Sequence, residues 1–185
     1  MKTRLKREEL WPDELPQSFF NRAIETIQYL KNEPFGGRSI VDIGEDNPLK
    51  GMIEAGLSVK IDSFNADFDN MFRCGKKYDV ILCFEVLEHL FNPLSFLEQL
   101  KCMLNKNGVI YLSTPYQYPQ CLKAVHHFHE IPTDRLMWLF DAAGLTVVEM
   151  KKITIAGNWY NHLTGIRPML RYFQKTRLFK LTVKS

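Results

Sequence analysis

The sequence predicts an α/β protein in which a mostly parallel sheet lies between flanking helices. Three observations lead to this fold class: continuous apolar runs that suit buried strands, amphipathic segments of helical period between them, and glycines at the junctions. At 185 residues and 45% hydrophobic, the chain can bury one core and is too short for two ordinary domains. We therefore expect an N-terminal helical segment over 1–37, packed on a single domain over 38–185.

The first half of the chain alternates between helix and strand patterns. Apolar residues three and four positions apart predict helices, and apolar runs that end at glycine or at polar residues predict strands. In order, we expect a helix over 15–31, a strand over 39–44, a helix over 48–55 closed by Gly56, a strand over 59–61 ending at Asp62, and a strand over 78–84.

The connection after Asp62 is short for a doubly wound sheet. Neighbouring parallel strands need a crossover of about a dozen residues or more, so the sequence lacks room for one further strand with its helix. The sheet should be shortened between the second and fourth strands of a full fold. A loop over 63–77 is expected where an edge strand would lie.

The second half continues the alternation. The Asn107-Gly108 turn precedes one apolar run, and Gly144 ends an amphipathic segment. We expect a helix over 93–104, a strand over 109–113, a helix over 133–143, a strand over 145–150, and a final strand over 178–183 that could run antiparallel.

Composition and charge narrow the functional classes. The first seventeen residues contain no apolar run that could act as a signal sequence or span a bilayer, so we expect a cytoplasmic protein. The four cysteines form no C-x-x-C pair, which argues against a zinc knuckle or a disulfide framework. The net charge is +3; residues 150–185 contribute +8 of it, which leaves −5 for the preceding residues.

Four segments together resemble class I S-adenosylmethionine-dependent methyltransferases. They are V-D-I-G at Val41–Gly44, the run at Tyr78–Leu90, the run at Leu104–Pro115, and the run at His127–Leu145. Each is weak alone, but the four occur in the family's order. The resemblance covers roughly residues 38 to 150 and implies a Rossmann-like fold. In such a sheet a nucleoside ligand lies at the carboxyl ends of the strands, at the topological switch point.

The resemblance also implies a cofactor site made of strand-end residues: Asp42, Gly44, Asp62, Asp67, Phe84 and Glu85. Asp42 and Gly44 would line the methionine end of S-adenosylmethionine. Asp62 would accept both ribose hydroxyls, which the two oxygens of a carboxylate allow. Asp67 would lie near the adenine amine. The alternative for each acid is a solvated strand end or loop residue.

The glycine loop departs from the family pattern. Gly44 is followed by Glu45, Asp46, Asn47 and Pro48, whereas the family has further glycines that let the cofactor approach the backbone. Two carboxylates would lie near the cofactor's own carboxylate, which is unfavourable unless a cation intervenes. A scaffold that has lost its ligand is therefore an alternative to an active enzyme.

Acidic residues and histidines suggest a metal site. Glu85, Glu88 and His89 have the spacing of one helix face, and His129 follows the next strand. A similar E-x-x-E-H element binds a divalent ion in ubiquinone-type and small-RNA 2′-O-methyltransferases, so these four residues are the expected ligands. Without metal, His89, His127 or His129 could act as general base. Capping and loop roles remain the alternative.

These observations predict an S-adenosylmethionine-dependent methyltransferase that acts on a small or lipid-like acceptor, with oxygen favoured as the methylated atom. RNA 2′-O-methylation is a further alternative. The aromatic and basic stretch 158–177 could contact an anionic surface or cover the substrate, or its apolar residues could pack on the sheet while its basic residues stay solvated.

Overall fold

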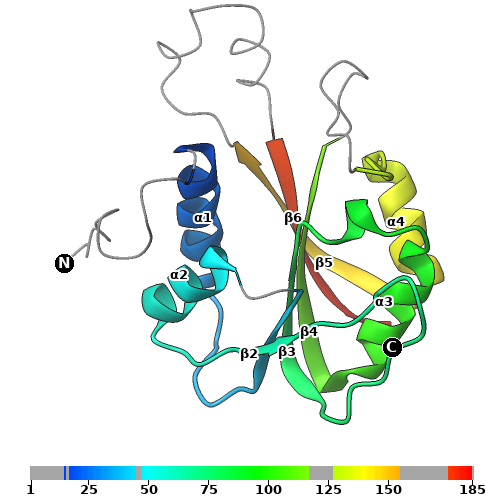
Figure 1. Cartoon of the computed structure of the whole chain (residues 1–185), viewed down its shortest axis with the longest axis horizontal. Helices are drawn as coiled ribbons and strands as arrows, with labels where there is room; N and C mark the ends of the chain where they lie inside the picture. Colours follow the sequence, from blue (N-terminus) through cyan, green and yellow to red (C-terminus); the bar gives the residue numbers. More distant parts are fainter. Residues whose placement is uncertain (1–14, 16, 45–46, 117–126, 155–174, 185) are drawn as a thin grey trace, which may run out of the picture.

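The computed structural model describes residues 15, 17–44, 47–116, 127–154 and 175–184. It confirms the α/β class: a six-stranded sheet lies between two layers of helices (Figure 1). The strands are β1 (Ile40–Ile43), β2 (Asp62–Phe64), β3 (Tyr78–Phe84), β4 (Leu104–Pro115), β5 (Leu145–Thr154) and β6 (Lys175–Val183). The helices are α1 (Gln17–Leu30), α2 (Pro48–Leu57), α3 (Pro93–Cys102) and α4 (Thr133–Ala142), with a 3₁₀ turn, η2, at Leu87–His89.

The sheet order is β2-β1-β3-β4-β6-β5. The strands β2, β1, β3 and β4 run parallel, and β6 inserts antiparallel between β4 and β5. The chain leaves β1 toward β2 on one side and later returns to β3 on the other. This reversal is the topological switch point, so a crevice is expected above the carboxyl ends of β1 and β3.

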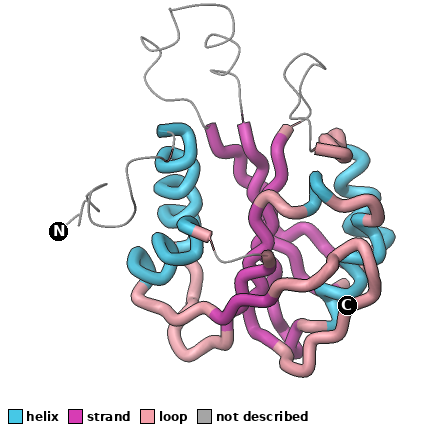
Figure 2. The backbone as a smooth tube through the Cα atoms, in the orientation of Figure 1, coloured by secondary structure: helices cyan, strands magenta, loops and turns pink. Residues whose placement is uncertain are grey.

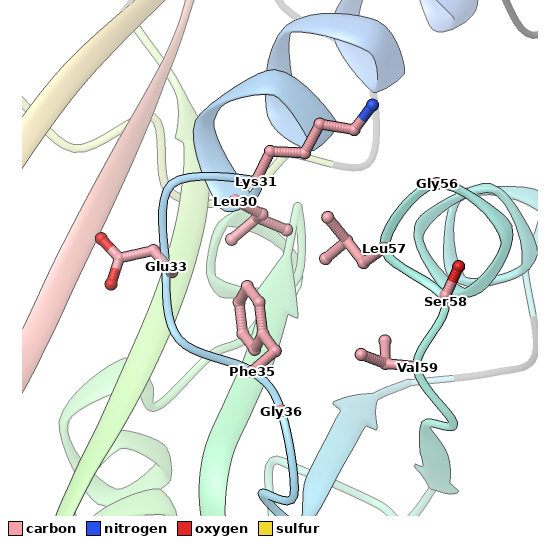
Figure 3. A pocket seen from close by; sticks show the side chains of 9 residues that line it. All are labelled: Leu30, Lys31, Glu33, Phe35, Gly36, Gly56, Leu57, Ser58 and Val59. Carbon is pink, nitrogen blue, oxygen red and sulfur yellow. The ribbon is translucent and has the colours of Figure 1, made fainter. Parts of the chain in front are cut away.

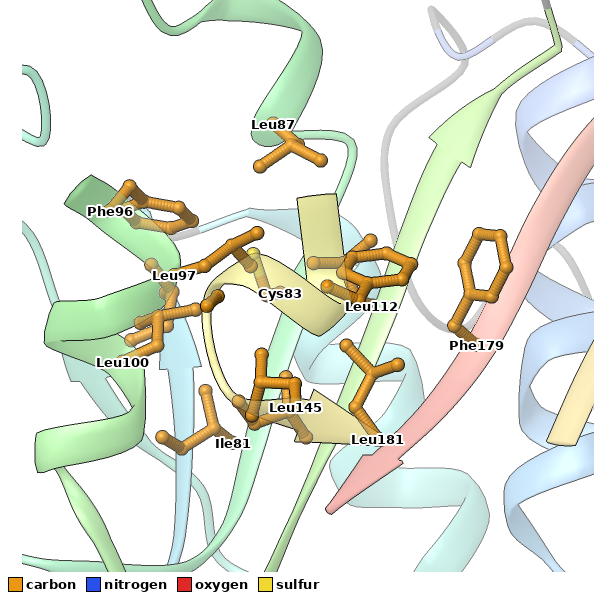
Figure 4. Close-up of a cluster of buried hydrophobic side chains, with 14 of the residues drawn as sticks. Ile81, Cys83, Leu87, Phe96, Leu97, Leu100, Leu112, Leu145, Phe179 and Leu181 are labelled. Carbon is orange, nitrogen blue, oxygen red and sulfur yellow. The ribbon is translucent and has the colours of Figure 1, made fainter. Parts of the chain in front are cut away.

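Each face of the sheet has its own apolar core. One core joins α1 and α2 to β1, β3 and β4, and includes Phe20, Leu30, Ile53 and Tyr111. The other joins α3 and α4 to the opposite face (Figure 4). Figure 2 shows the strands between the two groups of helices. Strands buried on both faces account for the near-continuous apolar runs seen in the sequence.

Several expected boundaries are wrong. Strand β4 begins at Leu104 and runs through the expected turn at Asn107-Gly108, β5 extends beyond 150 to Thr154, and β6 begins at Lys175 instead of 178. The second strand begins at Asp62 instead of ending there, because Glu54 of α2 accepts the backbone N–H groups of Val59 and Ile61 and keeps these residues out of the ladder. Helix α2 runs through Gly56 to Leu57 and is capped by Ser58 at φ 55°. Gly56 is needed inside the helix, since a Cβ there would lie 2.9 Å from the Ile27 side chain.

The shortened connection is confirmed. The residues between β2 and β3, all of which the structure describes, form a loop with no further strand or helix. Four phenylalanines fill the space against α3: Phe64, Phe68, Phe72 and Phe96 have ring centroids 5.4–6.3 Å apart. Asp69 fastens the loop, because its Oδ1 accepts the backbone N–H groups of Phe91 and Asn92. Aromatic packing thus replaces the absent strand.

Among the helices of the described part, none combines the length and the apolar character needed to cross a bilayer.

Candidate functional site

A cavity of about 270 Å³ opens at the carboxyl ends of β1 and β3, where the sheet topology predicts a ligand site. Its volume is close to the lower end of small-molecule sites, about 300 Å³. Residues from α1, β1, α2 and the end of β3 line it: Phe19, Arg22, Asp42, Ile43, Gly44, Asn47, Leu49, Phe84, Glu85 and Val86. Four of the six expected cofactor residues are among them.

Asp42 is held at the cavity by the start of α2. It is buried, and Asn47 Nδ2 donates to its Oδ2 at 2.9 Å. The Asn47 side chain also caps α2 by accepting from the Lys50 backbone, and Pro48 follows at the first helical position. Pro48 begins the helix as the sequence predicted, whereas the capping role of Asn47 was not foreseen. Together they direct a helix N-terminus and an oriented carboxylate at the same cavity.

Gly44 keeps the backbone feature expected of this loop. Its φ is 125°, a region that side chains disfavour, and its N–H donates to Phe64 O at the end of β2. Glu45 and Asp46, which raised the question of charge repulsion, lie outside the described residues.

Glu85 has a special backbone conformation at the end of β3. Its φ is 56°, and its N–H donates to the carbonyl and hydroxyl oxygens of Ser113 on β4. Each oxygen of its carboxylate accepts one hydrogen bond: Oε1 from Ser113 Oγ at 2.8 Å, and Oε2 from Arg22 Nη1 at 2.8 Å. A non-glycine residue held at positive φ is strained, and such strain concentrates at functional sites.

Arg22 is the cavity residue that the sequence analysis missed. It reaches from α1 to Glu85, and the two side chains are 24% and 18% exposed. Asp42 and Glu85 would alone make the cavity acidic, so Arg22 is the cation that a ligand carboxylate requires there. The cavity thus offers one guanidinium and two carboxylates, which suits a ligand group carrying both an ammonium and a carboxylate. A lone arginine in an amphipathic helix gave no hint of this role.

A second group of polar side chains lies one turn beyond Glu85. Ligating atoms of Glu88, His89 and His127 all lie within 4.8 Å of one another. The Glu88 side chain is buried, and neither carboxylate oxygen has a hydrogen-bond partner of standard geometry. Burial, followed by the neighbouring Glu85 charge, raises the pKa of Glu88 to about 8, against smaller lowering contributions from Arg22 and the Thr114 hydroxyl. An unpartnered buried carboxylate of this kind needs a proton or a cation.

Backbone hydrogen bonds bring the histidine segment to Glu88. The Glu88 carbonyl accepts from the N–H groups of both Phe128 and His129, at 2.9 and 3.1 Å. The His127 ring then lies across the His89 ring, with centroids 5.0 Å apart. Glu130 Oε1 lies 3.3 Å from His127 Nδ1. If Nδ1 carries the hydrogen of this contact, the lone pair of Nε2 is left for a metal ion or a proton.

The structure groups other side chains than the four expected ligands, and metal binding itself stays a prediction. The cluster includes His127, whereas the His129 side chain is not part of it. Glu85 also lies outside the cluster, since Arg22 and Ser113 occupy its oxygens. The assumption of a common helix face was wrong: only Leu87–His89 forms a 3₁₀ turn, and Glu85 precedes it in a left-handed conformation.

Asp62 and Asp67 lie apart from the cavity lining. Asp62 is the first residue of β2, and Lys76 Nζ donates to it at 2.6 Å, which lowers the pKa of the Asp62 carboxyl. Asp67 is exposed and accepts from Asn70 Nδ2 at 2.7 Å within its own loop. Their roles toward ribose and adenine stay predictions.

A second cavity, of about 280 Å³, lies between the ends of α1 and α2 (Figure 3). Its lining combines apolar Leu30, Phe35, Leu57 and Val59 with polar side chains, among them Glu33, which pairs with Lys180 at 2.7 Å. The first cavity is the better candidate site because it lies at the topological switch point of the sheet.

Four parallel strands with β6 antiparallel between β4 and β5, and Asp42 on β1 followed by the positive-φ Gly44, agree with a class I S-adenosylmethionine-dependent methyltransferase fold. Comparison with known proteins agrees. Residues 37–150 match the family model described as a methyltransferase domain, and the chain belongs to this family.

Two groups of relatives are similar in sequence. The ubiquinone biosynthesis O-methyltransferase of Haemophilus ducreyi is 33% identical over 106 residues, which are 48% of this chain and 42% of that protein. The tRNA U34 carboxymethyltransferase of Campylobacter jejuni is 46% identical over 48 residues, which are 26% of this chain and 16% of that protein. The matches thus span less than half the length of these relatives.

Solved structures share the fold at low identity. The O-methyltransferase of a Brevibacillus brevis trans-AT PKS multienzyme, in complex with S-adenosyl-L-homocysteine, has a TM-score of 0.58 and 14% identity, covering 95% of this chain and 82% of that one. The [4+2]-cyclase SpnF has a TM-score of 0.56 and 12% identity, covering 89% and 81%. Because a cyclase shares the fold, the fold alone does not define the reaction.

Proposed function

We propose that this protein transfers the methyl group of S-adenosylmethionine to an oxygen of a small acceptor. The observation that carries the proposal is the cavity at the β1–β3 switch point, which joins the Arg22 guanidinium to the carboxylates of Asp42 and Glu85. The amino-acid end of the cofactor carries one carboxylate and one ammonium. Its carboxylate would bind Arg22 and the N-terminus of α2, and its ammonium would bind the two acids.

The acceptor site lies beside the Glu88–His89–His127 cluster. When bound, S-adenosylmethionine supplies an activated methyl group: the acceptor oxygen forms a bond to the methyl carbon, the carbon–sulfur bond breaks, and S-adenosylhomocysteine remains. His127 is the preferred base for the acceptor hydroxyl, since its Nδ1 contact with Glu130 leaves Nε2 to take the proton. The resulting imidazolium would be stabilised by the Glu130 carboxylate.

As an alternative to base catalysis by His127, the same three residues fit a divalent ion, which would then take the Nε2 lone pair of His127. Both oxygens of buried Glu88 lack hydrogen-bond partners, and one carboxylate with two imidazoles is a donor set that manganese, iron or zinc accepts more readily than magnesium does. A bound ion would lower the pKa of an acceptor hydroxyl. Glu88→Gln should reduce manganese retention by about tenfold or more, as loss of one of three protein ligands requires. Glu98→Gln, at an exposed position of α3, is the matched control.

Methyl transfer itself is tested with 3,4-dihydroxybenzoate and S-adenosylmethionine, with and without manganese. Formation of S-adenosylhomocysteine together with the mono-O-methylated product supports the proposal. Cofactor binding without turnover of this acceptor or of a phenol panel would favour the non-catalytic scaffold, which the altered glycine loop at 45–48 suggests. The relatives named ubiquinone biosynthesis O-methyltransferases favour a small acceptor, whereas RNA 2′-O-methylation rests on the expected metal site and the basic C-terminal segment.

Two further expectations stay predictions. One is the cytoplasmic location. The other is contact between the basic C-terminal segment and an anionic surface, because residues 155–174 lie outside the described part.

A further inference from the structure

The last strand places one arginine at the site end of the sheet. Because β6 runs antiparallel to β4, its first residues lie beside the carboxyl end of β4. Arg177 is opposite Thr114 of β4 and Lys152 of β5, and it is fully buried. One alternative for the stretch 158–177, in which its basic residues stay solvated, is wrong for Arg177.

The Arg177 guanidinium joins the two ends of the β4–α4 connection. Nη2 donates to the carbonyl oxygens of Pro115, the last residue of β4, and of Ile131 (2.9 Å to the latter). Nη1 donates to Thr133 Oγ1 at 3.1 Å, at the start of α4. The guanidinium also lies over the Tyr116 ring, 4.8 Å from its centroid. Such a fixed fork of donors is specific to arginine, since a lysine ammonium is a single point charge.

Burial of this charge has a large desolvation cost, which an apolar residue of similar volume would avoid. A buried arginine at this position is explained if the protein needs the geometry that its hydrogen bonds fix. The fixed acceptor Ile131 is only four residues after His127, and Glu130 between them contacts the His127 ring. Successive Cα atoms are about 3.8 Å apart, so the segment from His127 to Ile131 is short. A displacement of Ile131 should therefore also displace His127.

We propose that Arg177 is a positioning residue for His127: by tying Pro115, Ile131 and Thr133 together, it holds the histidine segment on the Glu88 turn. This inference rests on the proposed function for the importance of His127. The geometric claim itself can be tested without activity.

The test compares Arg177→Lys with Lys180→Met in the full chain. Lys180 lies three residues further along β6 and pairs with Glu33 on the α1 side, so its loss removes a partly buried cation from the same strand away from the cluster. Amide hydrogen exchange reports the Phe128 and His129 N–H groups bound to Glu88, and ¹⁵N spectra of the imidazoles report the His127 tautomer. If Arg177→Lys does not fold, Thr133→Val replaces it in the test. This variant removes one hydrogen-bond acceptor of the guanidinium and keeps Arg177.

In Arg177→Lys, the Phe128 and His129 amides should exchange at least about tenfold faster relative to core amides of β1 and β3, and His127 should change from one tautomer to a mixture. Lys180→Met should leave both readouts unchanged. Unaltered exchange and tautomer in folded Arg177→Lys, or in Thr133→Val as the substitute, would overturn the inference. An inactive wild-type protein that passes this test would refute the proposed function and leave the positioning role intact.

Discussion

Replacement of Arg22 by methionine tests how the cavity binds the amino-acid end of the cofactor. Methionine keeps much of the length and apolar stem but removes the charge. A hydrogen bond to a charged group contributes about 1.5–3 kcal/mol. Arg22 must be shared with Glu85, and the pair is about one-fifth exposed, so we take the lower half of that range. A loss of about 2 kcal/mol corresponds to roughly thirtyfold weaker binding.

The assay is calorimetric titration with two ligands. S-adenosylhomocysteine carries the amino-acid end, and 5′-methylthioadenosine lacks it. Arg22→Met should weaken only the first. Arg38→Met is the matched control, since Arg38 donates to the Asp79 backbone and does not line the cavity. Equal loss of affinity for both ligands, or no loss for either, would refute the role assigned to Arg22.

Three further predictions concern stability and the tail. Hydrogen bonds from Ser39 lower the pKa of Asp79 to about 2, so its stabilisation is complete above the unfolded pKa near 4 and is lost as the pH falls toward 2. Urea unfolding should show Asp79→Asn less stable by about 1–2 kcal/mol at pH 7 and no less stable at pH 2; an equal difference at both pH values would contradict this. Gly56→Val should cost about 1–3 kcal/mol, because its side chain would overlap Ile27; unchanged stability would mean that α1 and α2 repack freely. If the +8 segment 150–185 binds anionic surfaces, the protein should sediment with phosphatidylglycerol vesicles at low salt and be released as salt rises; no sedimentation at low salt would exclude this role.

The strand and helix order could be predicted because the sheet is buried on both faces. The apolar run Tyr78–Phe84 is β3 to the residue, and the missing strand after β2 followed from the length of the connection. Boundaries failed where individual contacts decided them. The Glu54 carboxylate accepts the Ile61 N–H ahead of β2, and the backbone of Ser58 forms the cap expected at Gly56. Such contacts depend on tertiary neighbours, which periodicity does not report.

The sequence predicted where the site lies, but it did not predict which side chains contact one another there. Asp42, Gly44, Phe84 and Glu85 meet at one cavity because they lie at the carboxyl ends of neighbouring parallel strands. The metal ligands were assigned by helical spacing, which the left-handed Glu85 and the short η2 turn invalidate. Arg22 and Arg177 come from elements distant in sequence, and their contacts with Glu85 and Ile131 depend on how α1 and β6 pack.

The central claim is that the β1–β3 cavity binds S-adenosylmethionine despite the altered glycine loop. Calorimetric titration of the wild-type protein with S-adenosylhomocysteine tests it most directly, because the product binds without turnover. We expect one site per chain, with a dissociation constant between about 1 µM and 1 mM, the range common for enzyme substrates. The absence of binding heat and of thermal stabilisation at millimolar ligand, in a folded protein, would contradict the claim and leave the fold as a scaffold.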